Sequence, residues 1–165
     1  VLDDVLANVP KEKIDERILN FKSSMNTMPI DNISMPTGVK NLKKYVERKT
    51  KNQTFSTFKS GAPVHVKSAV NYNDLLLHFE ISKQYLYISS AEKIRWVYLT
   101  KNPLGIESLA YKGYEDPKEI LQYIRDYIDY DKMYDKNLHR KIMMFYEAMA
   151  WSEPIDKNFT LERFF

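Results

Sequence analysis

The chain has 165 residues, of which 44% are hydrophobic and 28% charged, and its formal net charge is +3. This hydrophobic fraction suffices for a sizeable core in one domain and argues against wholesale disorder. The absence of cysteine excludes disulfides, thiolate nucleophiles and cysteine-based metal sites, and the lack of any membrane-length apolar run or signal peptide predicts a soluble, cytoplasmic protein.

The N-terminal half predicts three helices. The first covers about residues 9–25, the second begins at Thr37–Gly38, and the third runs from about Pro63 to Glu80. A connector with two prolines separates the first two helices, and a polar loop over residues 50–61 precedes the third. The apolar positions at helical spacing are Ile14, Ile18, Phe21 and Met25, then Val39, Leu42, Tyr45 and Val46, then Val66, Ala69, Val70, Leu76 and Leu77.

The C-terminal half predicts a β-hairpin followed by two helices. Alternation over residues 94–98, an Asn-Pro-Leu-Gly turn and a second apolar run are typical of a hairpin. Asp116 is expected to cap the next helix, with Pro117 at its first position and Glu119 completing a capping box. The last helix, over about residues 131–150, should bury one stripe, formed by Tyr134, Leu138, Ile142, Phe145 and Met149. The predicted fold class is therefore α+β and mostly helical, with one small hairpin.

The residues that could carry catalysis do not form a recognisable centre. His65, His78 and His139 are scattered and have no carboxylate at ligand spacing, so ordinary histidines are the favoured interpretation. Asp129 and Asp131 form an Asp-x-Asp pair that could hold Mg²⁺, but they sit at a junction between predicted helices, where capping acids are common. The sequence predicts no catalytic residue, no metal site and no cofactor.

Basic residues on the last predicted helix give a binding signal. Lys132, Lys136 and Arg140 recur at intervals of four residues and should share one face. Such a face can contact DNA phosphates, but most stripes of this kind are ordinary solvated faces, and the stripe alone favours that interpretation. We call these three residues the basic ridge.

A second binding signal lies in "MPTGVKNLKKY", residues 35–45. The small-residue turn Thr37–Gly38 at a helix start, followed by Lys40 and Lys44, would form a phosphate seat. An ordinary helix entry with solvated lysines explains the same residues.

The C-terminal residues are unusually apolar. Asn158-x-x-Leu161-x-x-Phe164-Phe165 has the form of a sliding-clamp binding peptide, with Asn where Gln is usual. One helical turn would place Leu161, Phe164 and Phe165 together as a plug for a hydrophobic pocket. The alternative is a tail that folds back onto its own core. The expected organisation is a domain over residues 1–158 and a tail over residues 159–165.

Several segments together resemble one family. "SMPTGVKNLKKY", "SGAPVHVKSAVNYNDLL", "EKIRWVYLTKNPLG", the basic helix and the apolar tail follow, in order and spacing, the thumb subdomain of T4-like phage family B DNA polymerases. The resemblance covers about residues 15–165, and the closest local matches are residues 71–73 and 102–105. It implies a thumb-like domain that grips primer–template duplex DNA through the sugar-phosphate backbone and is tethered to a sliding clamp.

The resemblance also implies which residues contact DNA. The positions that match the family are Thr37, Gly38, Lys40, Lys44, Lys67, Lys136 and Arg140, with Lys59 as the nearest candidate for a displaced family lysine. After the Asn-Pro-x-Gly turn, where the family carries a basic residue, this chain has Glu107, and Lys112 lies nearby.

The chain lacks the exonuclease acids, the finger helix and the palm Asp-x-Asp of that family. It is therefore expected to complete a DNA-directed DNA polymerase, a nucleotidyltransferase, whose active site lies in a separate catalytic chain with palm, fingers and exonuclease. It would be either the second chain of a split phage polymerase or a fragment cut at the same boundary, acting in the host cytoplasm. Two alternatives remain: a free-standing DNA-binding replication accessory protein, and a protein-interaction module without DNA binding.

Overall fold

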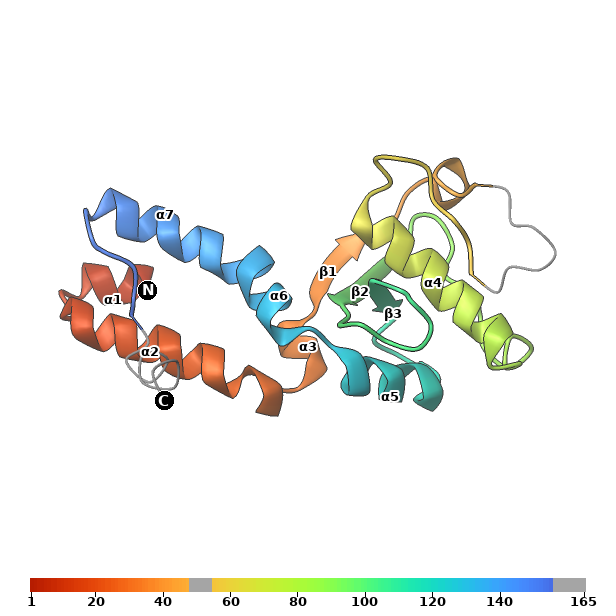
Figure 1. Ribbon diagram of the computed structural model, residues 1–165, viewed down its shortest axis with the longest axis horizontal. Coiled ribbons are helices and arrows are strands. Elements are labelled where there is room, and N and C mark those ends of the chain that lie inside the picture. The colour runs from red at the N-terminus through yellow and green to blue at the C-terminus, as the bar shows by residue number, and fades with distance from the viewer. Residues whose placement is uncertain (48–54, 156–165) are drawn as a thin grey trace, which may run out of the picture. The chain divides into compact units, whose positions relative to one another are not determined.

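A computed structural model describes residues 1–47 and 55–155, and these fall into two compact units (Figure 1). Unit 1 combines residues 1–28 with the chain from Tyr130 onward, and unit 2 is the continuous segment Pro29–Asp129. The protein is α+β and mostly helical, with a small antiparallel sheet of three strands, which confirms the predicted fold class. Among the helices of the described ranges, none has both the length and the apolar character required to cross a membrane.

Unit 1 is built from helices only in its described part. Its elements are α1 (Leu2–Leu6), α2 (Lys11–Ser24), the 3₁₀ turn η1 (Met25–Thr27), α6 (Tyr130–Tyr134), the π-helical turn η3 (Asp135–His139) and α7 (Arg140–Ala148). The helix α2 runs alongside α6 and α7 (Figure 1), and the Tyr146 hydroxyl donates a hydrogen bond to Asp15 between α7 and α2. Its small core consists of Ile14, Ile18, Met25, Met133, Tyr134 and Tyr146.

The last predicted helix is present, but the stripe predicted for it is only partly right. Tyr134 is buried as expected, whereas Phe145 is 37% and Met149 is 42% exposed, and Tyr146 is buried instead. The reason is the π-helical turn η3, in which backbone hydrogen bonds join residues five apart and not four apart as in an α-helix. Positions beyond this turn no longer keep the spacing of a continuous α-helix.

Unit 2 holds the sheet. Its elements are α3 (Ile30–Ile33), β1 (Met35–Gly38), the 3₁₀ turn η2 (Leu42–Lys44), α4 (Val64–His78), β2 (Lys93–Tyr98), β3 (Ser108–Tyr111) and α5 (Lys118–Tyr127). The strand order is β1-β2-β3, and both pairs are antiparallel, with Trp96 opposite Met35 on one side and Ala110 on the other. The helix α4 packs on β3 and β2 (Figure 1), so the sheet and α4 enclose the larger of the two cores.

The hairpin prediction is confirmed by β2 and β3, but the helix predicted to start at Thr37–Gly38 is wrong. Both residues belong to β1, where Thr37 lies opposite Ile94 and Gly38 opposite Lys93. The free edge of β2 needs backbone partners, and β1 supplies them. Only the three residues of η2 remain helical in this region.

The start of α5 also differs from the prediction. Pro117 occupies the N-cap position, and the first turn has no side-chain cap. The Asp116 carboxylate instead accepts the backbone N–H groups of Lys112 and Gly113, at 2.7 Å each. The turn before the helix, in which Gly113 has a φ of +89°, leaves these two groups without strand partners, and Asp116 satisfies them.

Candidate nucleic-acid interface

A short antiparallel pairing in unit 2 joins two segments that carry predicted DNA-contacting lysines. Val46 and Phe58 form a β-bridge. On either side of it, the Lys59 N–H donates to the Tyr45 carbonyl and the Glu47 N–H to the Thr57 carbonyl, both at 2.9 Å. The pairing places Lys59 directly beside the end of η2.

Two aromatic rings of this pairing lie beneath lysine ammonium groups. The Nζ atom of Lys44 is 5.4 Å from the Tyr45 ring centroid, and Nζ of Lys67 on α4 is 5.9 Å from the Phe58 ring centroid. At these distances a ring attracts a cation and restricts its position. We call Lys44, Lys59 and Lys67 the lysine cluster. Its first two members are exposed and Lys67 is half-buried.

The lysine cluster comprises three of the predicted contacts, on the two paired segments and on α4, and Lys40 is a further exposed lysine just before η2. The sequence alone did not indicate the roles of Tyr45 and Phe58. The Tyr45 ring directly after Lys44 was visible in the sequence, but the contact of Phe58 with Lys67 on α4 appears only in the folded chain.

Thr37 and Gly38 do not form the predicted phosphate seat. They lie in β1 and not at the start of a helix. The Thr37 Oγ1 atom accepts a hydrogen bond from the Trp96 indole N–H at 3.2 Å. A Cβ atom added at Gly38 would meet nothing within 4 Å, so no close backbone approach requires glycine there.

The basic ridge lies in unit 1 and spans the π-helical turn. Lys132 on α6 is half-buried, whereas Lys136 on η3 and Arg140 on α7 are exposed. Asp135 lies on the same turn, with its carboxylate 4.0 Å from the Lys136 Nζ atom. The ridge therefore carries an acid as well as three cations.

Lys112 cannot substitute for the basic residue that Glu107 replaces. Its side chain is only 7% exposed, and its Nζ atom lies 3.5 Å from a Glu92 carboxylate oxygen. The same ammonium donates to the Tyr87 carbonyl at 3.3 Å. Lys112 thus acts inside unit 2, where its ammonium is engaged by Glu92 and the Tyr87 carbonyl.

The tail residues Leu161, Phe164 and Phe165 lie outside the described residues, so clamp binding by the tail stays a prediction.

Within residues 1–47 and 55–155, no group of three or more His, Asp or Glu side chains could hold a metal ion. Asp129 and Asp131 fall in different units, and the Asp129 N–H donates to the Tyr98 carbonyl at 2.9 Å. His65 is half-buried in the first turn of α4, and burial lowers the pKa of its imidazole.

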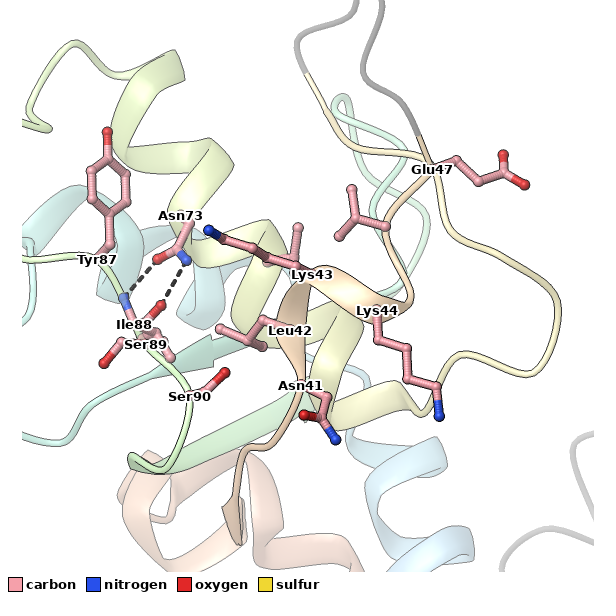
Figure 2. Close-up of a pocket in the computed structure, with 12 residues that line it drawn as sticks. Asn41, Leu42, Lys43, Lys44, Glu47, Asn73, Tyr87, Ile88, Ser89 and Ser90 are labelled. Atoms are coloured by element: carbon pink, nitrogen blue, oxygen red, sulfur yellow. Dashed lines mark hydrogen bonds between the residues drawn. The ribbon is translucent and has the colours of Figure 1, made fainter.

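A pocket of about 900 Å³ opens beside η2 in unit 2, and sequence reasoning missed it (Figure 2). The buried side chains Leu42, Val70 and Ile88 form its apolar part. Asn73 on α4 holds the opposite wall, because its amide donates to the Ile88 carbonyl at 2.9 Å and accepts the Ile88 N–H at 2.7 Å. The pocket walls come from η2, α4 and the segment around Ile88, which meet only in the folded chain.

No protein-family model matches this chain, and no curated protein has significant sequence similarity to it.

Proposed function

We propose that this chain is the non-catalytic thumb portion of a phage family B DNA polymerase, which grips primer–template duplex DNA in the host cytoplasm. The observation that carries the proposal is the lysine cluster, in which Lys44 and Lys59 flank the two segments joined by one β-bridge and Lys67 contacts the ring of the bridge residue Phe58. The catalytic chain and a sliding clamp are the proposed protein partners.

The chemistry of the cluster suits a DNA backbone. Ammonium groups are compact charges that bind phosphate oxygens without reading base edges. The aromatic rings under Lys44 and Lys67 limit the freedom of these side chains, which lowers the entropy lost on binding. Such contacts hold a duplex of any sequence, as a polymerase that moves along its product requires.

A double variant tests duplex binding by the lysine cluster. Lys59→Ala with Lys67→Ala should weaken binding of primer–template DNA similarly for unrelated sequences. The slope of log affinity against log salt should fall by about 2, because two phosphate contacts are lost. Fluorescence anisotropy over a salt series measures both quantities.

The matched control is Lys83→Ala with Lys118→Ala, which removes two exposed lysines of unit 2 outside the cluster. Equal loss of affinity in both double variants would show a general charge effect and contradict the assignment. Absence of salt-dependent duplex binding in the wild-type chain would favour the protein-interaction module.

Primer extension separates the thumb proposal from a free-standing accessory protein. A thumb should co-purify with the polymerase's catalytic chain and raise the length of its products, and the chain alone should show no synthesis. Stimulation without any stable complex would favour the accessory protein.

Tethering to the clamp is tested with the chain shortened by residues 159–165. We expect unchanged primer extension without clamp and loss of clamp-stimulated long products, because Leu161, Phe164 and Phe165 would supply the apolar anchor. A shortened chain that unfolds, or that still responds fully to its cognate clamp, would assign these residues to the core.

A further inference from the structure

We propose that the pocket beside η2 binds one unpaired DNA nucleotide, with its base on the apolar wall and its phosphate at Lys43. This inference goes beyond the proposed duplex grip and does not depend on it, because none of the side chains that carry it belongs to the lysine cluster. The argument rests on shape, on the chemistry of the lining and on charge.

The pocket has the size and the apolar wall that a flat ring requires. Its volume of about 900 Å³ lies at the upper end of the range for small-molecule sites, roughly 300–1,000 Å³. Leu42, Val70 and Ile88 are each less than 10% exposed and present apolar surface to it. Bases bind such surfaces through their faces, whatever their hydrogen-bonding edges.

An aromatic ring and a cation border the same space. Tyr87 lies at the rim with 44% of its surface exposed. Figure 2 shows Lys43 reaching across the mouth toward Asn73, while the side chains of Lys44 and Glu47 extend away from it. The Lys43 ammonium therefore borders the opening, and it complements a phosphate.

Of the remaining polar groups of the pocket wall, some form hydrogen bonds within the protein and others face solvent. Asn73 is committed to the Ile88 backbone, and the Ser89 hydroxyl donates to a Glu92 carboxylate oxygen at 2.6 Å. The Ser90 hydroxyl and the Asn41 amide also border the pocket, and both residues are exposed. They can accept or donate to the edge of a bound base.

A duplex cannot use this pocket, since its base faces are stacked inside the helix. An unpaired nucleotide exposes a face and retains its phosphate, which matches a positive rim around an apolar hollow. The pocket should therefore distinguish single-stranded from duplex DNA, whereas the lysine cluster should not.

The test compares three probes on the full chain by fluorescence anisotropy: a labelled oligothymidylate, an abasic strand of the same length and charge, and a duplex. Wild-type protein should prefer oligothymidylate to the abasic strand. Tyr87→Ala, and Ser90→Trp, which fills the mouth, should each weaken oligothymidylate binding about tenfold and leave the other two affinities unchanged. Lys43→Ala should weaken binding of both single strands.

Tyr114→Ala is the matched control, because it removes an exposed tyrosine of unit 2 that does not line the pocket. Tyr87→Phe keeps the ring and should retain binding, and thermal unfolding confirms that each variant is folded. Equal wild-type affinity for the oligothymidylate and abasic strands would overturn the proposal, as would full oligothymidylate affinity in folded Ser90→Trp. Loss of duplex binding in the Lys59/Lys67 double variant alone would leave this proposal intact.

Discussion

Asp116 stabilises the turn that leads into α5, and this role differs from the helix cap that its position suggests. Its two carboxylate oxygens accept the N–H groups of Lys112 and Gly113, at 2.7 Å each. Burial raises the pKa of Asp116, and the N–H donors offset part of that rise. Glu119 is exposed and makes no capping bond in the structure.

The two acids should therefore respond differently to mutation. Asp116→Ala leaves two backbone N–H groups without their acceptor and should lower the free energy of unfolding by about 2 kcal/mol. Glu119→Ala should change it by less than about 0.5 kcal/mol, as is usual for exposed positions. Urea unfolding followed by circular dichroism measures both values. Similar losses of unfolding free energy for the two variants would instead support the predicted capping box of Asp116 and Glu119.

At the scale of elements, the basic ridge depends on a helix that changes its repeat. The π-helical turn η3 separates Lys132 on α6 from Arg140 on α7, and Asp135 lies within 4.0 Å of Lys136. The acid offsets part of the charge that Lys136 presents to a phosphate. Arg140 is thus the stronger candidate for a DNA contact in unit 1.

If the basic ridge contacts DNA, removing its charges should reduce the affinity for duplex DNA. Lys136→Ala with Arg140→Ala should weaken duplex binding equally across sequences and reduce the salt slope by about 2. Arg140→Ala should account for more than half of the lost affinity. The control is Lys13→Ala with Lys141→Ala, two exposed lysines of unit 1 outside the ridge. If the ridge variant binds duplex like the wild type at low and moderate salt, the basic ridge is a solvated face and does not contact DNA.

At the scale of the molecule, the two units differ in how they are built. Unit 2 is one continuous segment and contains most of the fully buried large side chains, including Tyr72, Leu75, Ile94 and Leu109. Unit 1 joins two separated segments, and several of its large apolar side chains are exposed, among them Leu6 at 72% and Met144 at 65%. The core of unit 2 should therefore be the more stable.

Residues 29–129 should fold without the rest of the chain. We expect cooperative thermal unfolding and dispersed amide resonances from this fragment, because its sheet, α4 and α5 bury one another. It should also retain duplex binding through Lys59 and Lys67, with a smaller salt slope than the full chain because it lacks the basic ridge. A fragment with non-cooperative unfolding would show that unit 2 needs unit 1.

The sequence by itself determined the elements whose signals are local. The periodicities of α2 and α4 and the alternation of β2 were readable, and each of these three elements begins and ends within a few residues of its prediction. The exposed lysines were also visible as candidates, since charge needs no tertiary context to be recognised.

Only the tertiary structure decided the features that join distant segments. Thr37 and Gly38 form a strand because β2 offers an edge, and Lys59 lies beside Tyr45 because Val46 and Phe58 pair. The pocket likewise exists only where η2, α4 and the segment around Ile88 converge. Such pairings depend on long-range hydrogen bonding and packing, which override the local preferences that a sequence pattern records.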